Sequence, residues 1–394
     1  MISRRGTAFS LALLLSAHAH AELQTWTDSA GRTFRAEFQR MEGPSVIFTM
    51  EGGRVLAIPL TNLNATDQAR VQAAPPATTG ASTPAAANRL NFGYPWPAEI
   101  RMDGPPLSKV VSEDAKTSRF VYESPNYRFT CNVRLTPDVL RNFAMMFETT
   151  RKYTTSVPLS LDGGILRQGR YDILLFETKE QYIAAGGRGG SAACYIPSMG
   201  AVLAPMQSVG LTKTGTGFSL DTAKTSDVLI HELVHQLTPN SYMSAALNNG
   251  WFVEGLAEYI SSTPYSWGYF RPDPQGNAVL SYVTAYGEDR KGGRALGTKI
   301  RVPRLQRFML MGYEEFAGEK GNLHYGLGLL LTHYFLHMEG GGKSSRITAY
   351  LKGIREGQTG QAALAPLLGG SSFEKLEGEF AAAWRRKGIE LVFE

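Results

Sequence analysis

The feature that most constrains the fold of this chain is the pentad His231-Glu232-Leu233-Val234-His235, followed after eighteen intervening residues by Glu254. On an α-helix, residues at positions i and i+4 lie about 40° apart on one face, so both imidazoles can reach a single point. Two His and a carboxylate from a second helix, with a fourth position left for water, form a ligand set of catalytic zinc sites. The spacing therefore predicts two packed helices with a zinc site between them.

Local signals mark the ends of the first helix. Thr225 or Ser226 can cap its start, and Asp227 adds negative charge to the first turn. Pro239 prevents the helix from continuing beyond the second His. These signals predict a helix of three to four turns that carries the pentad.

The second helix is predicted from Trp251 to Ser261. It places Glu254 and Glu258 one turn apart on the same face. Gly255 lies in its interior, where a glycine costs about 1 kcal/mol relative to alanine. We interpret this glycine as allowing a close approach to the first helix. The alternative is that the two His are ordinary half-buried residues and that Glu254 belongs to an unrelated helix.

The sequence of the second helix adds a family resemblance. The pentad and the later run W-F-V-E-G-L-A-E-Y resemble the gluzincin metallopeptidases, the group that contains thermolysin and the aminopeptidase N family. In the aminopeptidase N family this helix reads W-x-N-E-G-x-A, and the chain departs from it only at Val253, where Asn is usual. The resemblance implies His231, His235 and Glu254 as zinc ligands and Glu232 as general base. It also implies that Glu258 orients a ligand His, a role that is chemically reasonable by itself.

A later run resembles the oxyanion-binding segment of the same family. Tyr325-Gly-Leu-Gly328 is similar to Tyr-x-Lys-Gly, with Leu327 in place of the Lys. The resemblance makes Tyr325 the first candidate to stabilise the oxyanion and the adjacent His324 the second, since either can donate a hydrogen bond. A tyrosine that merely packs on a helix face is the alternative. His333 and His337 also share i, i+4 spacing, but they lie well round the helix from Tyr325 and are interpreted as a satisfied structural pair.

The N-terminal residues 1–21 have the pattern of a secretory signal peptide: two Arg, a short apolar run and an Ala-His-Ala cleavage site. An uncleaved anchor is the alternative, but the run is too short to span a bilayer and no later stretch is long enough. We expect an exported protein, periplasmic or secreted, without a transmembrane segment. Removing this segment lowers the formal charge from +5 to +3 because it holds two Arg and no acid, which gives no case for a nucleic-acid partner.

The segment 22–72 is predicted to be a small β domain, because short alternating runs are separated by Gly, Asp and Ser turns. It resembles the SH3-like SLA homology 1 module, which implies a possible protein or peptide ligand; an appendage that only stabilises the fold is the alternative. Residues 73–87 are almost all Ala, Pro, Thr, Gly and Ser, the composition of a linker.

Residues 88–394 are expected to form the metallopeptidase domain, giving an α+β chain overall. Up to Thr225 the patterns indicate an α/β subdomain, with a helix at 137–153, strands at 127–133 and 171–176, a short helix at 178–185 and a hairpin around 197–200. The region after the second ligand helix is mostly helical, with helices predicted at 323–338 and 373–387. In gluzincins an edge strand before the pentad pairs with extended substrate, and 200–205 occupies that place; an ordinary interior strand is the alternative.

Cys131 and Cys194 both lie in predicted strands. An oxidising compartment would permit them to form a disulfide, and two buried thiols are the alternative. Neither is a credible nucleophile or ligand beside the complete His/His/Glu set.

These observations predict a zinc-dependent peptidase acting on a peptide or protein substrate. Glu232 would take a proton from water and later deliver it to the leaving amine.

Aminopeptidases of the resembling family hold the free amino terminus of the substrate with a Glu. The corresponding stretch 198–206 has no acidic residue, although Glu177 or Asp221 could substitute. An endopeptidase is therefore favoured over an aminopeptidase. A non-catalytic zinc-stabilised binding protein is the alternative from another class, and the intact Glu232 argues against it.

Overall fold

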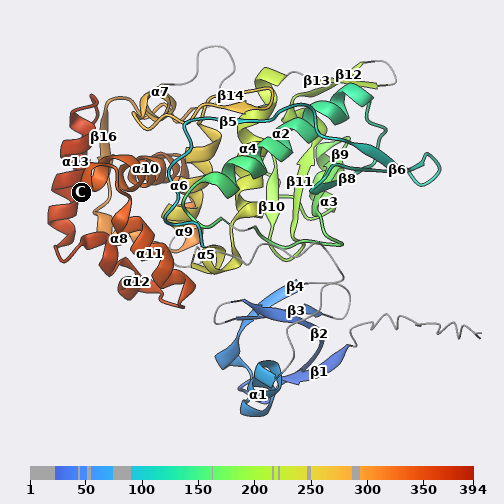
Figure 1. The fold of residues 1–394 in the computed structure, drawn as a ribbon, viewed down its shortest axis with the longest axis horizontal. Helices are drawn as coiled ribbons and strands as arrows, with labels where there is room; N and C mark the ends of the chain where they lie inside the picture. The colour runs from blue at the N-terminus through green and yellow to red at the C-terminus, as the bar shows by residue number, and fades with distance from the viewer. Residues whose placement is uncertain are drawn as a thin grey trace, which may run out of the picture. The chain divides into compact units, whose positions relative to one another are not determined.

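The computed structural model describes residues 23–42, 45–50, 55–73, 90–161, 163–214, 217–220, 222–245, 250–285 and 293–394, so the predicted signal peptide and most of the predicted linker lie outside the described residues. The chain divides into two compact units, shown as ribbons in Figure 1. Unit 1 comprises Met1–Met41 and Ser45–Ala77, and unit 2 comprises Glu42–Pro44 and Thr78–Glu394. Helices and strands are both abundant among the described residues, in agreement with an α+β fold.

In its described part, unit 1 is a β-sheet followed by a short 3-10 helix (Leu60–Asn62) and one α-helix. The strands, in sheet order, are β1 (Gln24–Thr27), β2 (Thr33–Glu42), β3 (Ser45–Met50) and β4 (Val55–Pro59). Trp26 and Phe48 lie in its core, and the Trp26 indole N–H donates to Ala36 O (2.9 Å). The helix α1 (Ala65–Ala73) was not predicted. Its first turn is capped by Asn64, whose side-chain oxygen accepts from Asp67 N–H (2.8 Å).

Unit 2 contains a mixed sheet of six strands in the described part of the chain. In sheet order these are β10 (Cys194–Ile196), β11 (Ala201–Pro205), β9 (Tyr171–Phe176), β8 (Tyr127–Cys131), β7 (Arg119–Glu123) and β6 (Lys109–Asp114). β11, β9 and β8 are parallel, and both ends of the sheet are antiparallel. The predicted strands near 127 and 171 and the predicted hairpin around 197–200 are confirmed.

Helices cover both faces of this sheet. Figure 1 shows α2 (Pro137–Ser156) and α4 (Thr222–Leu237) over one face, where they contact each other and the strands β8, β10 and β11. The short helix α3 (Lys179–Ala184) contacts β9 and β11 on the other face and begins with a capping box at Thr178. All five residues of β11 are buried, so this strand is an interior strand. The expectation that 200–205 is the edge strand was therefore wrong, because β10 lies outside β11 in the sheet.

The rest of unit 2 is mainly helical and packs on α4 through α6 (Gly250–Ser261). The further helices are α5 (Asn240–Ala245), α7 (Asn277–Thr284), α8 (Leu305–Met309), α9 (Tyr313–Phe316), α10 (Gly321–His333), which continues into a π-helical turn at Tyr334–Met338, α11 (Ser345–Arg355), α12 (Gly360–Leu368) and α13 (Phe373–Arg385). Short strands complete the list: β5 (Ile100–Arg101), β12 (Leu211–Thr214), β13 (Gly217–Leu220), β14 (Tyr265–Ser266), β15 (Tyr269–Phe270), β16 (Lys299–Val302) and β17 (Glu390–Phe393).

The helix pair α6 and α10 is packed through glycines. A Cβ on Gly255 would lie 2.4 Å from the Gly328 carbonyl oxygen of α10, and one on Gly328 would lie 2.9 Å from Trp251 O of α6. Gly255 therefore allows a close approach to α10, and the expectation that it faces the first ligand helix was wrong. This packing fixes the position of α6, which carries Glu254, against the helical half of unit 2.

Cys131 and Cys194 are both free and buried, in strands separated by β9 and β11, so the alternative of two buried thiols holds. Within the described residues, every helix is either too short or too polar to cross a bilayer.

Candidate metal centre

The first ligand helix is α4, and it is longer than the sequence signals suggested. It begins at Thr222, so Thr225, Ser226 and Asp227 lie inside it and do not form its cap and first turn as expected. It ends at Leu237, two residues before Pro239, as predicted. The buried Leu229, Ile230, Leu233 and Val234 attach this helix to the core, which directs the opposite positions, His231 and His235, toward α6.

The side chains of His231, His235 and Glu254 converge on one point, and they are the group that could hold a metal ion among the described residues. His231 Nε2 lies 3.0 Å from His235 Nε2 and 3.1 Å from Glu254 Oε2, and His235 Nε2 lies 3.2 Å from that same oxygen. Two ligand atoms bound to zinc at about 2.1 Å and at tetrahedral angles are about 3.4 Å apart. The three atoms are therefore spaced nearly as a zinc ion would hold them.

The protonation of His231 tests whether this group suits a metal. Its Nδ1 lies 3.0 Å from Glu258 Oε1, where it donates its proton. A neutral His231 then presents the unprotonated Nε2 to His235 and Glu254. Lone pairs from these three side chains would repel each other at these distances unless a proton or a metal cation lies between them. The residues present thus fit a divalent metal. Of the ring nitrogens of His231 and His235, only His235 Nδ1 has no hydrogen-bond partner among the described residues.

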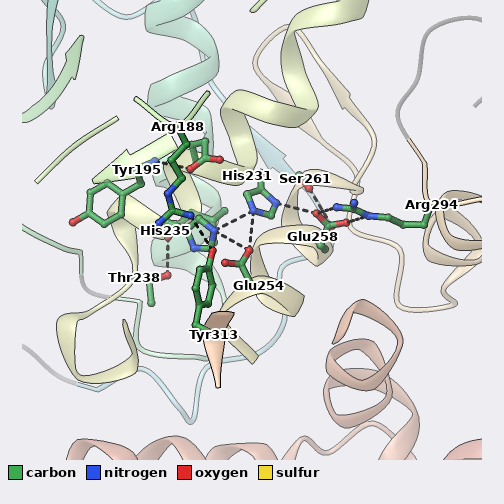
Figure 2. A network of polar contacts seen from close by, with 12 residues as sticks. Arg188, Tyr195, His231, His235, Thr238, Glu254, Glu258, Ser261, Arg294 and Tyr313 are labelled. Carbon is green, nitrogen blue, oxygen red and sulfur yellow. Dashed lines mark hydrogen bonds and ion pairs between the residues drawn. The ribbon is translucent and has the colours of Figure 1, made fainter. Parts of the chain in front are cut away.

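Glu258 is held in turn by Arg294. The guanidinium donates to both carboxylate oxygens, with Arg294 Nε 2.9 Å from Glu258 Oε2. Figure 2 shows the resulting line of side chains, Arg294 to Glu258 to His231, running up to the converging ligands. Burial of Glu258 raises the pKa of its carboxyl, but the hydrogen bond to His231 and the charge of Arg294 outweigh burial and lower it. Glu258 therefore stays ionised and fixes the tautomer of His231.

Charge in the cluster is strongly coupled. Burial of His231 alone would lower the pKa of its imidazole, but the hydrogen bonds and charges of Glu254 and Glu258 raise it to about 10. For Glu254, burial would raise the pKa of the carboxyl, but His235 and His231 outweigh burial and lower that pKa well below its usual value. Without a metal, the cluster thus attracts a proton to His231; with a metal, the cation takes the place of that proton.

Glu232 does not converge with His231, His235 and Glu254 but contacts a different partner. Its Oε2 accepts the Tyr195 backbone N–H of the edge strand β10 at 2.6 Å. Burial raises the pKa of the Glu232 carboxyl, and the neighbouring His231 and His235 oppose that rise. A half-buried carboxyl with a raised pKa, beside the ligand group but outside it, has the properties of a general base.

Two tyrosines approach the ligands from the helical half. The Tyr325 ring of α10 lies 6.2 Å from the His231 ring, centroid to centroid. Burial and then the nearby Glu254 raise the pKa of both Tyr325 and Tyr313, and each of the two tyrosines also acts on the pKa of the other. Both hydroxyls are therefore protonated donors near the ligand carboxylate. Tyr313 was not identified from the sequence.

Arg188 completes this side of the cluster and was also missed. It follows α3, and its Nη1 lies 3.4 Å from the Tyr313 hydroxyl. Figure 2 shows Arg188 and Tyr313 reaching each other from opposite sides beside the ligands. The sequence held no spacing signal for Arg188, Tyr313 or Arg294, although a lone Arg between two Gly pairs in 186–190 is an unusual pattern that could have been noticed.

His324 makes its contacts elsewhere. Its Nδ1 hydrogen-bonds Phe316 O at 2.8 Å, and its ring packs on Phe308 and Phe316. It also lines a cavity of about 500 Å³ together with Arg301 and Leu323. None of the contacts of His324 within the described residues is with the ligands, so Tyr325 and Tyr313 are better placed than His324 to donate to an oxyanion.

The expectation that the i, i+4 pair His333 and His337 is a hydrogen-bonded structural pair holds for only one of the two residues. His337 Nε2 hydrogen-bonds the Tyr259 hydroxyl at 2.7 Å. Both ring nitrogens of His333 are buried without a hydrogen-bond partner in the described part of the chain. Burial lowers the pKa of His333 to about 3 and that of His337 to about 4, so both are neutral near pH 7.

Comparisons with known proteins identify no relative: no family model and no curated protein matches this chain.

Proposed function

We propose that this chain is a zinc-dependent peptidase, exported by its N-terminal segment, with Glu232 as the general base. The observation that carries the proposal is the convergence of His231 Nε2, His235 Nε2 and Glu254 Oε2 within 3.0 to 3.2 Å of each other. Bound there, zinc would lower the pKa of a coordinated water and polarise a substrate carbonyl. The gluzincin resemblance of the pentad and of α6 supports the same assignment.

The protein side chains supply the proton transfers and the charge stabilisation. The Glu232 carboxylate accepts the proton of the attacking water, and its raised pKa suits it to hold that proton and pass it to the leaving amine. The hydroxyls of Tyr325 and Tyr313 remain protonated and can donate to the oxygen that gains negative charge when the carbonyl is attacked. Glu258 and Arg294 keep His231 in its ligating tautomer.

An endopeptidase is the form we propose. In the described part of the chain the edge strand next to Glu232 is β10, and its Tyr195 N–H already contacts the base, so an extended peptide laid along this edge would pass the reaction centre. Glu177, one candidate to hold a free amino terminus, is paired with Lys213 (2.6 Å). Asp221, the other, lies outside the described residues. The positive charge of Arg188 also disfavours an α-ammonium group at this site.

Two substrate series separate the alternatives. Purified zinc-reconstituted protein should cleave internally quenched, N-acetylated peptides and release little from single-residue aminoacyl fluorophores. Glu232→Gln should lose at least about 10²-fold in rate, the usual scale of general base catalysis, while Glu177→Gln serves as the matched control and keeps its activity.

Fast release from the aminoacyl substrates alone would replace the endopeptidase with an aminopeptidase. Zinc-loaded protein that is inert on both series, or a Glu232→Gln variant as active as wild type, would contradict the proposal.

A further inference from the structure

The backbone of Arg188 is fixed by hydrogen bonds, although the loop around it is rich in glycine. Its N–H donates to the Tyr182 hydroxyl at 3.1 Å, and its carbonyl oxygen accepts from the Ser191 N–H (3.1 Å) and hydroxyl (3.0 Å). The preceding Gly187 sits directly on the buried Tyr182 ring, because a Cβ there would lie 2.3 Å from a ring carbon. The loop thus packs against the end of α3 in a way that only glycine permits.

The side chain of Arg188 is accessible but fixed at its tip. The residue is exposed, while Nη1 donates to the Tyr313 hydroxyl and the guanidinium lies 5.8 Å from the centre of the Tyr313 ring. Tyr313 in turn lies near enough to Tyr325 and Glu254 for both to act on its hydroxyl. The cation is therefore held beside Tyr313, and the hydrogen bonds of its side chain within the described residues leave most of its N–H donors unused.

Among the described residues, no carboxylate forms an ion pair with Arg188. Arg294, the other Arg of the site, differs because Glu258 compensates its charge. Glu232 is near enough for its charge to act on Arg188 but lies beyond ion-pair distance, and it accepts from Tyr195 instead. A guanidinium matches a carboxylate by two parallel N–H···O bonds, and an uncompensated cation beside a reaction centre attracts anionic substrates.

We propose that Arg188, oriented by Tyr313, binds a carboxylate of the substrate and so makes the site selective for peptides that carry one near the cleaved bond. The carboxylate is either the free C-terminus or the side chain of Asp or Glu. This inference rests on the proposed function, because it takes the bound peptide to be a substrate. The binding of the peptide is nevertheless measurable without turnover.

The test uses the full mature chain loaded with zinc and four matched fluorescent peptides. The parent is N-acetylated, C-amidated and neutral, and the second peptide has a free C-terminus. The third carries one Glu next to the expected cleavage site and the fourth carries Gln at that same position; this Glu and Gln pair is repeated at each neighbouring position to form a series. Binding is measured by anisotropy with Glu232→Gln protein, alone and combined with Arg188→Gln, Arg188→Lys or Arg141→Gln. Arg141 is an exposed residue of α2 paired with Asp138 and serves as the matched control.

We expect carboxylate peptides to bind about 10- to 100-fold more tightly than the neutral ones, the scale of hydrogen bonds to a charged group. Arg188→Gln should abolish this preference, Arg188→Lys should retain part of it, and Arg141→Gln should leave it unchanged. Which peptide shows the preference, the free C-terminus or the Glu series, identifies the source of the carboxylate.

Kinetics with otherwise wild-type protein separate recognition from chemistry. In Arg188→Gln the ratio of kcat/KM between the carboxylate peptide and the neutral peptide should fall toward 1, mainly because the KM for the carboxylate peptide rises. A large loss of kcat on the neutral peptide would assign Arg188 to the transition state and overturn the inference. No preference in binding, or a preference that survives Arg188→Gln, would also overturn it. Absence of turnover with the binding preference intact contradicts only the proposed function.

Discussion

At the scale of single residues, the candidate centre depends on a chain of charges that extends two side chains beyond the group that could hold a metal ion. Arg294 holds Glu258, and Glu258 holds the Nδ1 proton of His231, which leaves Nε2 free to face His235 and Glu254. Each step satisfies a buried polar group that would otherwise be costly. The affinity for metal should therefore depend on a residue that never touches it.

Glu258→Gln provides the test of this dependence. An amide cannot match the carboxylate as an acceptor of the His231 proton and loses the attraction to Arg294, so zinc affinity should fall about 10- to 100-fold. Competition with a chromogenic chelator measures this affinity, with Glu177→Gln, whose partner is Lys213, as the control. Equal zinc affinity in Glu258→Gln and wild type would remove Glu258 from the centre.

The site residues that sequence reasoning could identify are those tied together by helical periodicity. His231 and His235 are one turn apart, as are Glu254 and Glu258, so their shared faces follow from spacing alone. Arg188, Tyr313 and Arg294 come from segments whose approach to the centre is set by tertiary packing. Their positions have no periodic relation to the pentad, and no local pattern could place them.

At the scale of elements, the helices that carry the centre are positioned by neighbours on both sides. α4 lies against the sheet, and α6 lies between α4 and α10. The contact of α6 with α10 is made at Gly255 and Gly328, where backbone meets backbone. A displacement of α6 would move Glu254 away from His231 and His235, so the helix packing and the ligand geometry are coupled.

A pair of glycine substitutions measures this packing. In Gly255→Ala the new Cβ would lie 2.4 Å from Gly328 O, so we expect a loss of stability of about 1–3 kcal/mol or more, together with weaker zinc binding. Gly378→Ala on the exposed face of α13, where a Cβ meets nothing within 4 Å, should instead raise stability by about 0.5–1 kcal/mol. Urea midpoints of the two variants give the comparison. A Gly255→Ala protein as stable as wild type would contradict the close contact.

The expectations for elements that were wrong have identifiable causes. The strand 201–205 was assigned to the sheet edge by family resemblance, although its unbroken apolar run of Ala, Val and Leu is typical of an interior strand. The start of α4 was placed late because Thr225 and Ser226 resemble a cap, whereas the helix extends back to Thr222. The strands and helices with strong periodicity, such as α2 and α13, were predicted closely.

At the scale of the whole molecule, the chain consists of a small β unit and a larger α+β unit. The end of α1 at Ala73 lies next to the predicted domain end at residue 72, and the predicted linker up to 87 is otherwise outside the described residues. The position of the small unit relative to the large one could not be predicted, because a segment of Ala, Pro and Thr specifies no contacts. The candidate centre lies entirely in the larger unit.

The most direct test of the zinc centre is elemental analysis of the purified chain after zinc reconstitution and removal of unbound metal. We expect one zinc per chain in wild type and in Glu232→Gln, because Glu232 lies outside the ligand group, and none in a His231→Ala/His235→Ala variant. Wild-type protein that retains no zinc, or a double variant that binds as much as wild type, would contradict the assignment of His231, His235 and Glu254 as the metal centre.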